Sequence, residues 1–299
     1  MYYLFRIATR IIPRMPRRLA YALATVVGLL AWLIAGKARR QATKNMLHVF
    51  GTQAQETRAG RRLLRRTVSG MFMHNVRNYV DLFILPSLSD EEILHTVHLI
   101  GWEHFHAALA SGKGIIIFAP HKGPFDYTTQ HMGVKGYDLT IPVERLADRR
   151  ILDLILDLRR SHGVSYVPLA GSTTLRTILQ KLRENKIVLI TADRAIEGQS
   201  IEIDFFGTPA RLPVGAVKLA QRTGAALIGI NCYRMSRGQA IGEWVPLSVE
   251  MTDEQRSSTD SMMHALIRKL EGIIRQHPEQ WLAFAPIWLE DIKKDSQGS

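Results

Sequence analysis

A histidine and an aspartate, two residue types that can move protons, lie five positions apart in the stretch H-K-G-P-F-D. His121 opens this stretch and Asp126 closes it, with a Gly123–Pro124 turn between them. A carboxylate that hydrogen-bonds to an imidazole fixes its tautomer and stabilises the imidazolium, which suits a general base. The spacing therefore predicts a His121–Asp126 pair. The alternative interpretation makes His121 a capping residue and Asp126 a helix N-cap.

The residues before His121 predict the element that positions it. Positions 115–118 read I-I-I-F, a continuous apolar run that is β-branched at three of its four positions. Such a run is typical of a strand buried on both faces, as in a parallel sheet. Pro120 would end the strand, so His121 would stand just beyond its carboxyl end. In open α/β sheets, that is where ligands bind.

Two later strands are expected to bring charged groups to the same edge. The runs 139–143 and 187–192 both read as strands, and helical patterns separate them. The charged residues that directly follow these two runs are Glu144, Arg145, Asp193 and Arg194. Repeated placement of such groups on one crevice is what an active site requires. The predicted fold class is α/β, with a mainly parallel central sheet flanked by helices on both faces.

Charge is concentrated at the N-terminus. The formal net charge is +12, yet residues 1–66 hold fourteen Lys or Arg and a single acid, Glu56, so the remainder is nearly neutral. Within this basic segment, residues 19–35 are apolar except for Thr25. The pattern predicts an N-terminal membrane-anchoring helix of about 25 Å, a little shorter than the roughly 30 Å hydrocarbon core.

The cations leave the placement of this helix open. They flank the apolar run on both sides, so the positive-inside rule gives no orientation. A short span and a shallow or re-entrant anchor therefore remain equal interpretations. A cleaved signal peptide and the core helix of a soluble protein are further alternatives.

The predicted organisation has three parts. Residues 1–45 form a basic, hydrophobic membrane-anchoring segment, 46–90 a helical amphipathic connector, and 91–299 the α/β domain. The single cysteine, Cys232, excludes an intrachain disulfide. No metal site is expected, because no carboxylate or cysteine completes the H-x-x-H and H-x-H pairs at 95–106. There is neither a G-x-S-x-G elbow nor a Gly-rich phosphate loop with Lys, so we expect no serine acyl-enzyme and no ATP.

An ordered set of motifs resembles the lysophospholipid acyltransferase superfamily. The resemblance is to the branch that holds the late (lauroyl/myristoyl) acyltransferases of lipid A synthesis and the phosphatidylinositol mannoside acyltransferases. The motifs are H-K-G-P-F-D, V-E-R-L, A-D-R, I-E-I-D-F-F-G-T-P-A-R-L-P-V-G, H-P-E-Q-W and the later P-I-W. The I-E-I-D-F-F-G block and the tail are more similar to the mannoside branch. The chain departs from the family's D-R-D motif at its third position, Ala195.

The resemblance implies a role for each matching residue. His121 would be the general base, Asp126 its orienting partner, and Glu202 a residue near His121 and the acceptor. Residues implied to bind the acyl donor, the oxyanion or the substrate are Glu144, Arg145, Asp193 and Arg194. The implied reaction moves a fatty acyl chain from acyl-CoA or acyl carrier protein, as co-substrate, to a hydroxyl of a glycolipid. No cofactor and no metal are implied.

The resemblance also implies a place for the enzyme and leaves two alternatives. We expect membrane lipids as partners, no nucleic acid, and a cytoplasmic (inner) membrane location with the catalytic domain on the cytoplasmic side. One alternative is a non-catalytic peripheral membrane or nucleic-acid-binding protein that uses the basic N-terminus. The other is a thioesterase with the same site. The acceptor lipid, acyl chain length, choice of donor and oligomeric state are left open.

Overall fold

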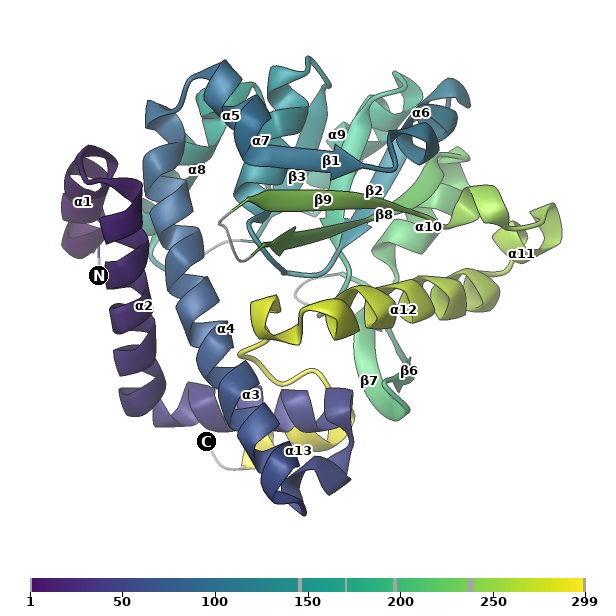
Figure 1. Ribbon diagram of the computed structural model, residues 1–299. Helices are drawn as coiled ribbons and strands as arrows, with labels where there is room; N and C mark the ends of the chain where they lie inside the picture. The colour runs from purple at the N-terminus through teal and green to yellow at the C-terminus, as the bar shows by residue number, and fades with distance from the viewer. Residues whose placement is uncertain (1, 145–146, 170, 196–197, 236–238, 298–299) are drawn as a thin grey trace.

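The computed structural model describes residues 2–297 except 145–146, 170, 196–197 and 236–238. At its centre is a seven-stranded sheet of order β1-β9-β8-β2-β5-β3-β4 (Figure 1). The strands are β1 (Val97–Ile100), β2 (Ile115–Ala119), β3 (Leu139–Val143), β4 (Ser165–Pro168), β5 (Ile187–Thr191), β8 (Ala226–Arg234) and β9 (Ala240–Pro246). Strands β8, β2, β5, β3 and β4 are parallel to one another. Strand β9 runs antiparallel to β8, and β1 is parallel to β9. The predicted mainly parallel sheet is confirmed.

Strand β2 lies in the middle of this sheet, between β5 and β8. Its register pairs Ile115 with Ile187 of β5 and with Ala226 of β8. All five β2 residues are buried. Because successive side chains of a strand point to opposite faces, Ile117 packs in one hydrophobic core and Phe118 in the other. The apolar run therefore forms a doubly covered strand, as predicted.

Helices cover both faces of the sheet, which also confirms the prediction. On the face of Ile117 lie α5 (Asp90–Thr96), α6 (Trp102–Ala110), α7 (Phe125–Val134), α8 (Arg149–Arg159) and the second half of α4 (Arg58–Ile84). On the face of Phe118 lie α3 (Gly36–Phe50), α9 (Ser172–Arg183), α10 (Gly215–Thr223), α12 (Thr259–Gln276) and the first half of α4. The hairpin of β6 (Ser200–Phe205) and β7 (Thr208–Pro213) packs in this second core. The short helix α11 (Asp253–Ser257) lies between β9 and α12, and α13 (Leu289–Gln297) lies near the C-terminus.

The N-terminus forms α1 (Tyr2–Ile11) and α2 (Arg17–Ile34), and α2 runs alongside α4 (Figure 1). The contact face of α2 is a stripe of small residues, Ala20, Ala24 and Gly28, all buried. A Cβ on Gly28 would lie 2.6 Å from Met73 Cα, so the two helices approach this closely only with glycine there. The opposite face is apolar and exposed. Its exposed large residues are Leu19, Leu23, Val26, Val27, Leu29, Leu30, Leu33 and Ile34.

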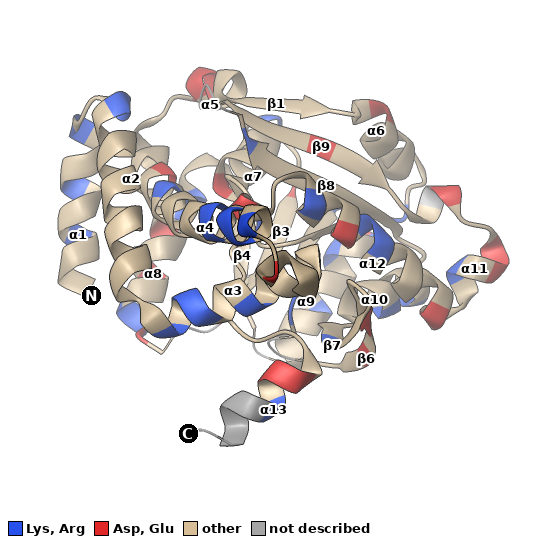
Figure 2. Cartoon of the chain, turned by 60° about the horizontal axis from the view of Figure 1, so that its bottom comes forward, with Lys and Arg blue, Asp and Glu red and all other residues tan. Residues whose placement is uncertain are grey.

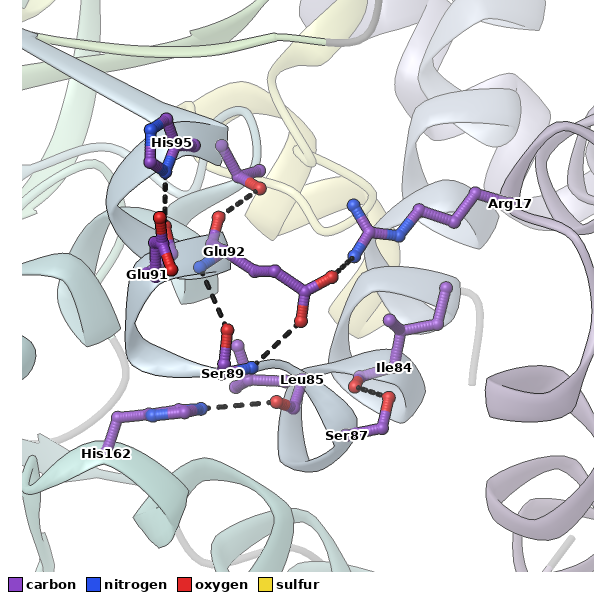
Figure 3. Close-up of polar contacts among 10 residues, drawn as sticks. Arg17, Ile84, Leu85, Ser87, Ser89, Glu91, Glu92, His95 and His162 are labelled. Atoms are coloured by element: carbon purple, nitrogen blue, oxygen red, sulfur yellow. Dashed lines mark hydrogen bonds and ion pairs between the residues drawn. The ribbon is translucent and has the colours of Figure 1, made fainter.

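Polar contacts tie the inner face of α2 to the body. The Tyr21 hydroxyl donates to Asp81 of α4 at 2.5 Å. At the start of the helix, Arg17 is 2.9 Å from Glu92, whose other oxygen accepts from the backbone of Ser89 in the capping box that begins α5 (Figure 3). Helix α2 is long and apolar enough to cross a membrane. Its inner face nevertheless belongs to the folded body.

Candidate active site

The carboxyl ends of β2, β5 and β3 meet at one edge, because these strands are adjacent and parallel. His121, Arg194 and Glu144, which follow the three strands, line the same cavity. Arg194 Nη2 lies 3.4 Å from Glu144 Oε2. The predicted convergence of charged groups is therefore seen. Arg145 lies outside the described residues.

The cavity itself is largely apolar and has a volume of about 360 Å³. It lies between the sheet and α4, α7 and α8, and extends from Trp244 on β9 to Tyr166 on β4. Those strands are five positions apart in the sheet, roughly 24 Å at about 4.8 Å per strand. Its walls between these ends include Ile117, Leu139, Ile141, Leu189 and Ile230. The cavity is therefore long and largely apolar, and His121 is among its lining residues.

The partner of His121 is Asp193. The Nδ1 atom of His121 lies 2.7 Å from Asp193 Oδ1, and the His121 backbone N–H donates to Asp193 Oδ2 at 3.0 Å. An ionised carboxylate only accepts hydrogen bonds, so Nδ1 carries the proton and Nε2 keeps its lone pair. The imidazole is partly exposed and lines the cavity. This is the tautomer that a general base needs.

Asp193 is held ionised although it is buried. A third donor, the indole Nε1–H of Trp281, reaches Oδ2 at 2.7 Å. Burial alone would raise the pKa of Asp193. The charge of His121 when its imidazole is protonated, together with the hydrogen bonds from His121 and Trp281, lowers that pKa to about 2. The carboxylate is thus available to stabilise an imidazolium at neutral pH.

The predicted hydrogen bond between His121 and Asp126 is wrong. Asp126 is buried in the first turn of α7, where its two oxygens accept from Arg159 Nε at 2.7 Å and Nη2 at 3.2 Å. Pro124 occupies the N-cap, so the capping interpretation of Asp126 is also wrong. The start of α7 carries Asp126 toward α8. The end of β5, adjacent to β2, instead supplies the carboxylate that His121 uses.

The structure also differs from the predicted placement of Glu202. This residue lies on β6, where its carboxylate is 3.1 Å from Arg211 of β7 and its side chain is 60% exposed. It is not among the residues that line the cavity. A catalytic role for Glu202 stays an untested prediction.

The turn after His121 is fixed by backbone contacts. Gly123 N–H donates to the Gln280 carbonyl at 3.0 Å, and Leu282 N–H donates to the His121 carbonyl at 2.8 Å. Gly123 has φ +65°, and a Cβ there would lie 2.2 Å from the Cys232 oxygen, so only glycine fits. Between these residues, the buried Lys122 donates to Asn231 Oδ1 at 2.6 Å, and burial lowers its pKa to about 8.

Sequence reasoning missed the partnership of Asp193 and Trp281 with His121. The motifs imply substrate binding for Asp193, and they contain Trp281 only as part of H-P-E-Q-W. The two residues come from segments 88 positions apart. Trp281 appeared within a motif, but no spacing along the chain indicates which partner its indole meets.

The model of the bacterial lipid A biosynthesis acyltransferase family matches residues 1–290. The chain belongs to this family. It is therefore an acyltransferase.

Individual members of the family differ in their named substrates. A phosphatidylinositol mannoside acyltransferase of Mycobacterium tuberculosis is 30% identical over 222 residues, 73% of this chain and 69% of its own. The protein of that name in Mycolicibacterium smegmatis is 25% identical, over 73% of this chain and 71% of its own. A lipid A biosynthesis acyltransferase of Haemophilus influenzae is 23% identical, over 89% and 80%. A match to the Thermotoga maritima 1-acyl-sn-glycerophosphate acyltransferase PlsC, with a TM-score of 0.36, 12% identity and 86% and 98% coverage, is too distant to add to this.

Proposed function

We propose that this family member transfers an acyl chain directly from a thioester to a glycolipid hydroxyl, with His121 as the general base. Nε2 takes the hydroxyl proton as the oxygen attacks the thioester carbonyl. Asp193 stabilises the resulting imidazolium. The tetrahedral intermediate then breaks its C–S bond, and the departing thiolate receives the proton from His121. The observation that supports this most is the oriented His121–Asp193 pair, whose imidazole lines the largely apolar cavity.

The cavity suits the acyl chain. Its aliphatic walls and its extent across the sheet favour an extended hydrocarbon, whose burial contributes about 0.8 kcal/mol per CH₂. The thioester carbonyl would then lie beside His121, near Arg194 and Glu144. Arg194 is the proposed cation for the oxyanion or for donor phosphates. The resemblance implies the same role for Arg145, which lies outside the described residues.

The donor is acyl-CoA or acyl carrier protein, both of which present an acyl thioester. For the acceptor, the mycobacterial relatives carry the name of phosphatidylinositol mannoside and the Haemophilus relative that of lipid A. The shared chemistry is an amphipathic sugar lipid with a free hydroxyl. We favour a phosphatidylinositol mannoside-like acceptor, because the mycobacterial relatives share the higher identity.

We further propose that α2 lies in the membrane surface and does not cross it. Its outer face is apolar, while its inner face is bound to a charged buried pair: Asp81 accepts from Arg234 as well as from Tyr21. Spanning the bilayer would carry these charges into hydrocarbon, which is costly. The adjacent basic surface suits anionic headgroups, since Lys and Arg are prominent on α3 and α4 (Figure 2). Thioester donors are cytoplasmic, so the site would face the cytoplasm.

The test is acyl transfer by the full-length protein in vesicles. Radiolabelled acyl-CoA and, separately, acyl carrier protein thioester are offered with phosphatidylinositol mannoside or with a lipid A precursor, and the products are identified by mass spectrometry. We expect one acceptor to gain one acyl chain with the wild type and none with His121→Ala. Transfer by a folded His121→Ala protein would refute the base. Release of free fatty acid without any acylated lipid would indicate a thioesterase instead.

A further inference from the structure

We propose that Trp281 is a positioning residue of the catalytic pair: its indole N–H holds the Asp193 carboxylate at the angle at which Oδ1 meets His121 Nδ1. This inference rests on the proposed role of His121. It assigns a task in the reaction to a residue of the C-terminal segment that touches neither substrate nor the reacting atoms.

The hydrogen bonds of Asp193 single out Trp281. Among the described residues, the carboxylate accepts three hydrogen bonds, and two of them come from His121 itself, through Nδ1 and the backbone N–H. Donors on one residue move with that residue, so they cannot orient the pair relative to the rest of the fold. The indole of Trp281, at 2.7 Å from Oδ2, supplies the one donor that comes from elsewhere.

Trp281 is itself rigidly held. It is fully buried, and its ring makes edge-on contacts with Phe205 at 6.2 Å and Trp288 at 6.4 Å between centroids. Its backbone forms an isolated antiparallel bridge with Lys122. The flanking Gln280 and Leu282 make the two backbone hydrogen bonds that fix the turn after His121. Three consecutive residues therefore hold both members of the pair, the histidine through its backbone and the aspartate through its side chain.

Removing the indole N–H alone should loosen the carboxylate without emptying the core. Trp281→Phe keeps an aromatic ring but leaves Oδ2 with a single donor. The buried carboxylate would then be less well stabilised, so the pKa of Asp193 would rise. The Asp193 carboxylate would also rotate more freely. A smaller fraction of molecules would then hold the His121 imidazole with Nε2 directed toward the substrate hydroxyl. At metal sites, loss of a hydrogen bond that orients a ligand costs about 10- to 100-fold in affinity or activity, and we expect a loss at the lower end of that range here.

Trp288→Phe is a matched control. Trp288 is also fully buried in the C-terminal segment, and its Nε1–H also makes one hydrogen bond, to the Phe205 carbonyl at 2.9 Å. It makes no hydrogen bond to Asp193 or His121 among the described residues. Both variants lose one buried hydrogen bond and the same ring volume, so they should lose similar stability. Trp288→Phe still places an aromatic ring beside Trp281 and leaves the indole N–H of Trp281 on Asp193, so only Trp281→Phe should change the chemistry.

The experiment measures kcat and KM against pH for both variants and the wild type, with radiolabelled palmitoyl-CoA and phosphatidylinositol mannoside vesicles. We expect Trp281→Phe to lower kcat about 10-fold and to leave KM unchanged. Trp288→Phe should keep the wild-type kcat and KM. Equal profiles for the two variants would overturn the inference.

A second measurement does not depend on turnover. A ¹³C NMR titration of the Asp carboxyl groups should show Asp193 beginning to take up protons at higher pH in Trp281→Phe than in the wild type or in Trp288→Phe. No difference would again overturn the positioning role. Should His121→Ala retain transfer, the proposed base would be wrong, while this titration would still decide whether Trp281 controls Asp193.

Discussion

The His121 imidazole binds the carboxylate of Asp193, which lies at the end of the neighbouring strand β5, and not that of Asp126, which shares its motif. The Nδ1–Oδ1 distance is 2.7 Å, and Asp126 pairs with Arg159 over the same distance. Two carboxylates therefore divide two tasks near one cavity. Asp193 orients the His121 imidazole, and Asp126 neutralises the buried Arg159 guanidinium.

We expect Asp193→Asn to abolish transfer while preserving the fold. The introduced amide would keep its oxygen toward the two N–H donors at the Oδ2 position. Its NH₂ group would then face His121 Nδ1, which would force the proton onto Nε2 and block the base. A wrong tautomer of this kind costs about 10⁴-fold in kcat in a related triad. Single-turnover transfer of labelled acyl-CoA measures the loss, and circular dichroism checks the fold. Near-normal kcat would contradict the assignment.

Asp126→Ala should act mainly on stability. It would leave Arg159, whose side chain is 18% exposed, as an uncompensated charge beneath Phe125 and Tyr166. Breaking a buried pair from one side costs about 3–5 kcal/mol. Urea unfolding measures this, and Asp126→Leu combined with Arg159→Met should recover part of the loss. If Asp126→Ala kept full stability but lost all transfer, Asp126 would have to act in the chemistry.

The two faces of α2 should respond differently to substitution. Val27→Glu on the exposed face should release the protein from anionic vesicles and leave its melting temperature nearly unchanged, because Val27 is half exposed. Gly28→Val should instead lower the melting temperature, since a Cβ there meets Met73 within 2.6 Å. Vesicle sedimentation and thermal unfolding distinguish these outcomes. Vesicle binding that survives Val27→Glu combined with Leu30→Glu would refute the surface anchor.

A larger side chain in the cavity should shorten the accepted acyl chain. Ile230 is buried on β8 and lines the cavity near Trp244. Ile230→Phe would fill that end at a cost of about 1–3 kcal/mol in stability from overpacking. We expect kcat/KM to fall for long acyl-CoA donors and to change little for short ones. Ile116→Phe, on the other face of the sheet, is the control. An unchanged chain-length profile would place the acyl chain elsewhere.

Stability should decline as the pH falls from about 6.5 to 4. Burial lowers the pKa of His131 to about 4, helped by nearby Lys135 and His98. An unfolded histidine binds a proton near pH 6.5. The unfolded state therefore binds more protons than the native state across this interval. As the pH falls, the free energy of unfolding decreases. His131→Phe should flatten this decline, because it removes the proton that the unfolded state takes up. Chemical unfolding at several pH values measures it.

Local sequence patterns predicted the central strand and the edge of the sheet at which the candidate site forms. The I-I-I-F run predicted β2 because continuous β-branched residues suit a doubly covered strand, and the charged residues after β3 and β5 predicted the edge at which the site forms. Both predictions depend only on the residues of a short segment. Once the strands are parallel and adjacent, their carboxyl ends lie at the same edge of the sheet.

Partner choice was decided only by the tertiary structure. Spacing placed Asp126 near His121 along the chain, but the helix beginning at Phe125 turns it toward Arg159, while strand order brings Asp193 beside His121. In the same way, hydropathy identified α2 as apolar, but only its packing on α4 separates a buried stripe of small residues from an exposed face. A sequence specifies which groups can pair. Strand order and helix packing, which depend on the whole core, determine which of them do.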